Sequence, residues 1–194
     1  MFVCELMRHF APAAIVTVFN GARKHERNTG GFIGLEVISA KISAIVHATE
    51  DVDRVLRALS RVFPEGSLPS KAETRKFDGH YGNDIRIVDL SIRGAPARSF
   101  LKYLWKSLPS FDRASILEAL DKHLDPSGGL HLRLDKEEVF RGTLRMKDQD
   151  PIKIHLSFRK EFKSNLDLSQ GIKQLLESLE SRQTYSNVRP EIVG

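Results

Sequence analysis

Two segments in the second half of the chain alternate strictly between apolar and polar residues, and this pattern constrains the fold most. In residues 130–135, Leu130, Leu132 and Leu134 alternate with His131 and Arg133. In residues 152–159, the apolar set is Ile152, Ile154, Leu156 and Phe158, and the intervening set is Lys153, His155, Ser157 and Arg159. Side chains of a β-strand point alternately to opposite faces. The pattern therefore predicts two strands, each with one buried and one exposed face.

The predicted exposed faces are basic. A third strand, at about residues 38–48, places Ile42, Ala44, Val46 and Ala48 inward and Lys41, Ser43, Ile45 and His47 outward. Three strands with Lys, Arg or His on the outward side indicate an open sheet face suited to polyanions, and nucleic acid is the polyanion we expect. These outward positions carry no aromatic residue, so stacking of bases on the sheet is not expected.

Composition agrees with a basic globular domain. The 194 residues are enough for one substantial domain, and a formal net charge of +5 is compatible with a nucleic-acid partner without requiring one. The single cysteine, Cys4, excludes an intrachain disulfide and the cysteine-rich zinc modules. A reducing cytoplasm is the expected compartment.

The chain divides into three predicted parts. Residues 1–36 form an N-terminal extension, residues 37–182 the main domain, and residues 183–194 a flexible tail. The apolar run at residues 10–19 is too short to span a bilayer, so no membrane partner is expected.

The order of elements predicts the fold class. After the first strand we expect a helix capped by Thr49 and running to about residue 63, then strands at 72–78 and 84–93. The remaining predicted elements are helices at 100–108 and 110–124, a strand at 130–135, a short helix at 136–142, strands at 143–147 and 152–159, and a helix at 167–181. Mixed order with hairpin connections predicts an α+β fold, with helices on one face of a mainly antiparallel sheet.

The loop Gly79-His80-Tyr81-Gly82-Asn83 joins the two strands of the predicted hairpin. One interpretation is turn chemistry, because Gly and Asn favour turns. The other is an RNA-contacting tip, since residues 70–106 hold eight basic and four acidic residues, a net charge of +4. The hairpin residues predicted to contact RNA are Lys71, Arg75, Lys76, His80, Tyr81, Asn83 and Arg86.

Motifs for catalysis are lacking. The sequence contains no Gly-rich phosphate loop and no GxSxG elbow. His47, His131 and His155 all occupy outward strand positions, and three imidazoles on one face could hold a zinc or nickel ion. Nothing in the sequence shows that the three strands are adjacent, and the nearby Arg and Lys would repel a cation. We therefore expect no converging histidine site, no cofactor and no enzyme activity.

Four motifs in order resemble a known family. They are Val46-His47-Ala48-Thr49-Glu50-Asp51, the loop Gly79-His80-Tyr81-Gly82-Asn83, Leu132-Arg133-Leu134-Asp135-Lys136, and Asp150-Pro151-Ile152-Lys153-Ile154. Together, over roughly residues 39–160, they resemble the archaeal RNA-binding proteins described as exosome-associated subunits. The glutamine that typically follows the Asp-Lys pair in that family is Glu137 here.

The resemblance implies a compact α+β fold similar to ribosomal protein L5, and RNA binding without catalysis in an archaeal cytoplasm. With the basic strands, it predicts contacts to structured RNA through phosphates and shape, in a role accessory to RNA processing or degradation by the exosome. The residues predicted to contact RNA outside the hairpin are His131, Arg133, Lys136, Lys153, His155 and Arg159. Two alternatives stay open: a protein-interaction adaptor of an RNA-processing complex, and a metal-dependent hydrolase. The identity of the RNA and the oligomeric state do not follow from the sequence.

Overall fold

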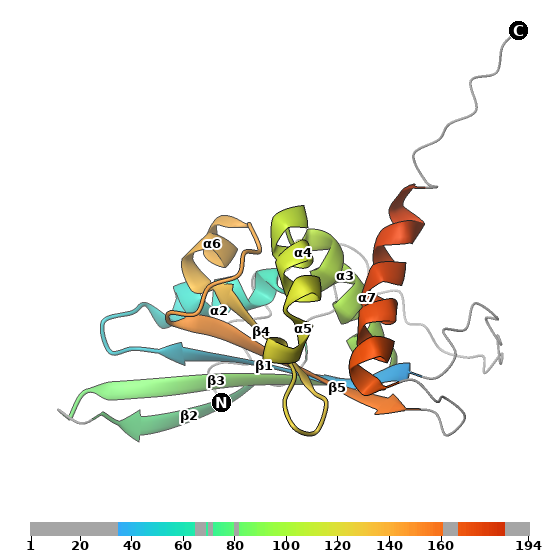
Figure 1. Ribbon diagram of the computed structural model, residues 1–194. Coiled ribbons are helices and arrows are strands. Elements are labelled where there is room, and N and C mark those ends of the chain that lie inside the picture. Colours follow the sequence, from blue (N-terminus) through green and yellow to red (C-terminus); the bar gives the residue numbers. More distant parts are fainter. Residues whose placement is uncertain (1–34, 65–68, 70–71, 80–81, 161–166, 185–194) are drawn as a thin grey trace, which may run out of the picture.

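A five-stranded antiparallel sheet forms the base of the molecule in the computed structural model, which describes residues 35–64, 69, 72–79, 82–160 and 167–184 (Figure 1). The strand order is β2-β3-β1-β5-β4. The strands are β1 (Leu35–Val46), β2 (Ala72–Asp78), β3 (Asp84–Arg93), β4 (Leu130–Asp135) and β5 (Pro151–Lys160). The helices are α2 (Val52–Arg61), α3 (Ala95–Ser107), α4 (Ser110–Glu118), α5 (Leu120–His123), α6 (Lys136–Arg141) and α7 (Leu168–Thr184).

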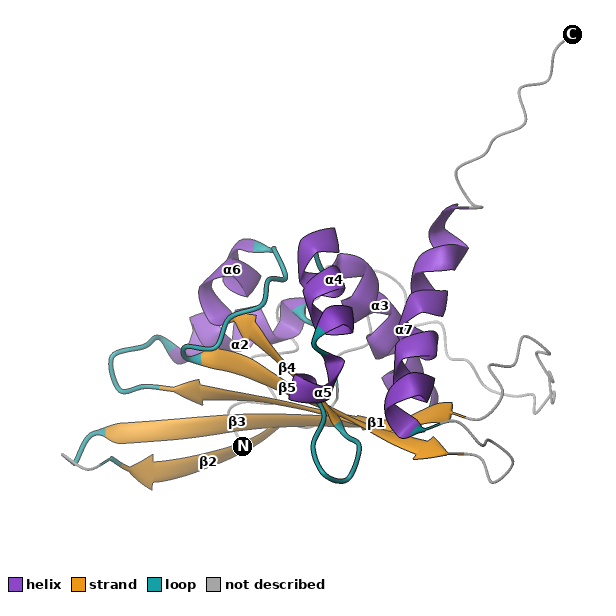
Figure 2. Ribbon diagram, in the orientation of Figure 1, coloured by secondary structure: helices purple, strands orange, loops and turns teal. Residues whose placement is uncertain are grey.

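The helices lie on one side of the sheet (Figure 2). The inward sides of the strands and the apolar sides of the helices form one core, in which Phe100, Leu104 and Trp105 of α3 are almost fully buried. The opposite side of the sheet carries none of the described helices, and we call it the open face. The predicted α+β class, with helices on one face of an antiparallel sheet, is confirmed; the likeness to ribosomal protein L5 stays a prediction.

The alternation in β4 and β5 has the predicted sides. Leu130, Leu132 and Leu134 are buried, while His131 and Arg133 are exposed. In β5 the buried residues are Ile152, Ile154 and Leu156. Because a slip of one residue would exchange the two faces, this burial fixes which side chains reach solvent on the open face.

Several element boundaries differ from the prediction. The N-cap of α2 is Asp51 rather than Thr49, because the Asp51 carboxylate accepts a hydrogen bond from the backbone N–H of Asp53 at 2.8 Å. Residues 143–147 do not form a strand; within them, only Met146 makes an isolated bridge, to Leu134. Strand β1 begins at Leu35, inside the predicted extension, and α7 ends at Thr184, two residues inside the predicted tail.

The rest of the predicted extension and tail, including the apolar run at 10–19, lies outside the described residues. Among the helices that the structure describes, none has the length and apolar character needed to cross a membrane.

Candidate nucleic-acid interface

Strand pairing arranges the open face in rows of side chains. Arg133 of β4 is the direct partner of Lys153 of β5, and Lys153 is the partner of Ser43 of β1. One row further, His131 pairs with His155, which in turn pairs with Lys41. Direct partners in an antiparallel pair project to the same face of the sheet. The polar residues of three strands therefore share one surface, as their outward positions in the sequence predict.

These side chains are accessible. The exposed fraction is 55% for Arg133, 66% for Arg159 and 49% for His131. Lys153 is also exposed, and among the described residues it forms no ion pair. His155 is 34% exposed. No helix among the described residues covers Arg133 or Lys153, so the open face remains a candidate platform for a ligand.

One buried carboxylate interrupts the basic surface. Asp89 of β3 is 7% exposed and pairs with Arg75 at 2.5 Å and Lys41 at 3.6 Å. Burial alone would raise the pKa of Asp89, but hydrogen bonds from Ser43 and Arg75 and the charges of Lys41 and Arg75 lower its pKa below the ordinary value. Asp89 therefore remains ionised and holds two of the cations of this face in place.

The hairpin residues do not lie on one surface. Arg75 is the partner of Ile87 and points to the open face, whereas Lys76 is the partner of Arg86, which is the partner of buried Val46. Lys76 and Arg86 thus belong to the helix-facing side of the sheet, and Lys76 pairs with Asp84 at 2.9 Å. Asn83 is exposed at the end of the hairpin. Lys71, His80 and Tyr81 lie outside the described residues.

An aromatic side chain does occur on the open face, contrary to the expectation that this face carries none. Phe77 of β2 is the partner of Ile85 and is 45% exposed. It lies two residues after Arg75, so both side chains point to the same face of the sheet. The guanidinium carbon of Arg75 lies 5.9 Å from the centre of the Phe77 ring. The expectation is wrong because it rests on three strands and leaves out β2, the strand that places Phe77 on this face.

The prediction that Lys136 contacts RNA is wrong, because its side chain is buried. It is 5% exposed, and its ammonium lies 2.9 Å from Glu50 Oε1, 2.7 Å from Asp150 Oδ2 and 2.8 Å from the carbonyl oxygen of Ile45. Burial would raise the pKa of Asp150, but Lys136 and His47 lower that pKa below the ordinary value. Lys136 therefore joins β1, the turn before α2 and the loop before β5, and is not available to a phosphate.

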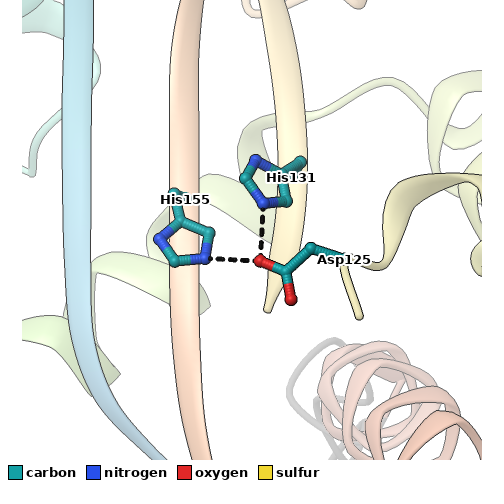
Figure 3. Close-up of side chains that lie close together, drawn as sticks. All are labelled: Asp125, His131 and His155. Atoms are coloured by element: carbon teal, nitrogen blue, oxygen red, sulfur yellow. Dashed lines mark hydrogen bonds and ion pairs between the residues drawn. The ribbon is translucent and has the colours of Figure 1, made fainter. Parts of the chain in front are cut away.

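The three outward histidines do not lie at one place, but His131 and His155 lie side by side. His131 and His155 have ring centroids 4.4 Å apart, and each Nε2 lies near the same oxygen of Asp125, at 2.9 Å and 3.2 Å (Figure 3). His47 lies elsewhere, beside Glu50 and Asp150. No sequence pattern indicates Asp125, because it belongs to the loop between α5 and β4 rather than to a strand.

The comparisons with known proteins place the chain in a family. A family model described as RNA binding matches residues 39–159, which include every strand except the first few residues of β1 and the last of β5. The chain belongs to the RNA-binding family. The matched region contains nearly all of the open face described above.

Two relatives and a solved structure resemble this chain over more than half of its length. The chain is 30% identical over 128 residues to "RNA-binding protein PAB1135" of Pyrococcus abyssi, covering 64% of this chain and 82% of the relative. It is 33% identical over 117 residues to "Uncharacterized protein MJ0213" of Methanocaldococcus jannaschii, covering 59% and 78%. The crystal structure of protein AF2318 from Archaeglobus fulgidus superposes with a TM-score of 0.57 at 27% identity, covering 74% of this chain and 99% of that one.

Proposed function

We propose that this protein binds RNA through the open face of its sheet. The main support is the pair Arg133 and Lys153. These two cations are direct partners in adjacent strands, and both are exposed. Like charges directly opposite one another destabilise a sheet. A polyanion lying across β4 and β5 would reverse that cost, because its phosphates neutralise both side chains and release counterions.

Further cations extend the surface toward the end of the sheet where β1 begins. Arg159 is exposed near one end of β5, and Arg93 is exposed near the end of β3 on the same face, where it is the partner of Ser39. Arg159 is held by Glu36 of β1 at 2.5 Å, and Arg75 by Asp89. Carboxylates that fix the positions of long cationic side chains reduce the entropy lost when those side chains meet phosphates.

Phe77 supplies a different kind of contact. An exposed aromatic ring on a sheet offers a stacking surface to an unpaired base, with little dependence on sequence. Its place on β2, beyond the cationic rows, suits a single-stranded segment that continues from a region held through phosphates. We therefore propose that phosphate contacts provide most of the affinity and that Phe77 adds an interaction with an unpaired base.

The wider role follows from the family resemblance. We propose binding without catalysis, in the cytoplasm, as an accessory to RNA processing or degradation, and structured RNA and the exosome as the partners that the resemblance implies. The RNA-binding family model and the name of the Pyrococcus relative support the RNA partner.

RNA binding by the purified protein tests the proposed function. The purified full chain is titrated into a labelled RNA hairpin carrying a single-stranded tail, with a DNA hairpin of the same sequence as the control. We expect RNA binding that weakens steeply as salt rises. Absence of binding at low salt would contradict the proposal and favour the adaptor role, in which this surface meets a protein.

A further inference from the structure

Two clusters of His, Asp and Glu side chains bring possible metal ligands together in the part of the chain that the structure describes. One consists of His47, Glu50 and Asp150, and the other of Asp125, His131 and His155. The first already contains a cation, because the Lys136 ammonium lies 2.7 Å from Asp150 and 2.9 Å from Glu50. In the second, no described lysine or arginine forms an ion pair with Asp125.

The three ligand atoms of the second cluster are close enough for one ion. His131 Nε2 and His155 Nε2 lie 2.9 Å and 3.2 Å from Asp125 Oδ2, and the three atoms all lie within 4.8 Å of one another (Figure 3). Ligand atoms bound tetrahedrally at zinc distances lie about 3.3–3.4 Å apart. Small side-chain rotations would therefore bring all three atoms to a common centre.

The loop before β4 fixes the carboxylate in position. Asp125 Oδ1 accepts hydrogen bonds from the backbone N–H of Ser127 at 2.8 Å, the Ser127 hydroxyl at 2.6 Å and the backbone N–H of Gly129 at 2.9 Å. These bonds leave Oδ2 directed at the two imidazoles. Such outer hydrogen bonds commonly orient metal ligands.

Gly129 provides the space for this approach. A Cβ atom at this position would lie 2.2 Å from His155 Nε2 and 2.7 Å from Asp125 Oδ2. Both distances are too short for atoms that are not bonded to each other. Any larger residue at position 129 would therefore separate the histidine from the carboxylate without removing a ligand.

We propose that Asp125, His131 and His155 form a binding site for a divalent transition-metal ion of the zinc class. Two neutral imidazoles and one carboxylate are typical ligands of Zn²⁺ and related ions. Mg²⁺ and Ca²⁺ prefer oxygen ligands and fit this set poorly. The half-exposed His131 leaves a side of the site accessible to solvent, where further ligands of the ion would lie. The ion would occupy the open face one row from Arg133 and Lys153, and would add positive charge to it.

The probes are Zn²⁺ and Co²⁺ with the full chain and no RNA. Isothermal titration with Zn²⁺ should give one site, and bound Co²⁺ should give visible absorption bands of a low-coordinate complex. His131→Gln and His155→Gln should each weaken Zn²⁺ binding at least about tenfold, while His47→Gln leaves it unchanged. Thermal unfolding of each variant without metal establishes that it is folded.

Gly129→Ala is the sharper variant because it keeps every ligand. It should lose the site as the histidine variants do, while His123→Gln, outside the cluster, should bind Zn²⁺ like the original chain. Equal Zn²⁺ affinity in the original chain, His155→Gln and Gly129→Ala would overturn the proposal, as would the absence of a stoichiometric site. Because no RNA is present, either result leaves the proposed RNA binding to its own test.

Discussion

Arg133 and Lys153 face each other across β4 and β5 on the side of the sheet that the helices leave uncovered. Arg133 is partly balanced by Asp148 at 3.1 Å, but Asp148 is 87% exposed, so this pair contributes little to stability. Lys153 forms no ion pair with any described residue. The arrangement is unfavourable for the isolated protein and favourable for a complex with a polyanion.

Replacing Lys153 should therefore not lower the stability of the free protein. We expect Lys153→Gln to leave the free energy of unfolding unchanged or to raise it by up to about 0.5 kcal/mol, because a like-charge partner is removed. Urea denaturation measures this. A decrease of more than about 1 kcal/mol would show that Lys153 has a structural role, and would count against the open face as a binding surface.

Replacing Lys136, in contrast, should lower the stability of the free protein. Lys136→Met leaves Glu50 and Asp150 near each other without their cation, and we expect a decrease of about 1–3 kcal/mol in the free energy of unfolding. This is less than for a fully buried pair because Asp150 is 43% exposed. The change should leave the salt dependence of RNA binding unaltered. A reduced slope in a folded Lys136→Met variant would return Lys136 to the contact surface.

The carboxylate Asp135 predicts a specific pH dependence. Burial would raise its pKa, but the hydrogen bond from Lys147, those from the N–H groups of Glu138 and Glu137, and the charge of Lys147 lower that pKa below 3.8. The folded state therefore binds fewer protons than the unfolded state. The resulting stabilisation is present above pH 3.8 and disappears as pH falls through the lowered pKa.

The variant Asp135→Asn tests this dependence because Asn still caps α6. We expect it to be less stable than the original chain at neutral pH, with the difference shrinking as the pH is lowered through the acid range. Urea titrations at several pH values measure the difference. A difference that stays constant with pH would contradict the role assigned to the Asp135 charge.

The exposed ring of Phe77 should contribute to binding of unpaired RNA. We expect Phe77→Ala to weaken binding of a single-stranded oligouridine by about 1–3 kcal/mol, the usual range for a stacked base. Phe111→Ala is the matched control, because Phe111 is 79% exposed but lies on α4 in the helix layer. Equal effects of the two variants, or unchanged binding by Phe77→Ala, would remove stacking from the mechanism.

The fold is largely predictable because alternation is a local property. The sides of β4 and β5 follow from residues two positions apart, and the strands at 72–78 and 84–93 have the predicted bounds. The strand predicted at 143–147 is wrong for the same reason. These residues form an irregular connection in which only Met146 makes a strand-like bridge, to Leu134, and local alternation does not distinguish such a connection from a strand.

The site is less predictable because it depends on contacts between distant segments. The neighbours of Lys136 in the sequence indicate an exposed residue, but its partners Glu50 and Ile45 lie 86 and 91 positions away. Asp125 reaches His155 across 30 positions. The side of the sheet on which Phe77 lies depends on the register of β2 against β3, which the sequence pattern does not determine.

The salt dependence of RNA affinity shows whether RNA binds to the open face. The double variant Arg133→Gln, Lys153→Gln is compared with the original chain and with a matched control, Lys102→Gln, Lys106→Gln, which removes two exposed cations from α3 in the helix layer. For a single-stranded RNA, the slope of log affinity against log salt should fall by about 0.7 for each phosphate that is no longer neutralised. We predict a slope smaller by about 1.4 for the sheet variant and an unchanged slope for the helix control. Equal slopes for all three proteins, or a reduced slope for the helix control alone, would contradict RNA binding on the open face.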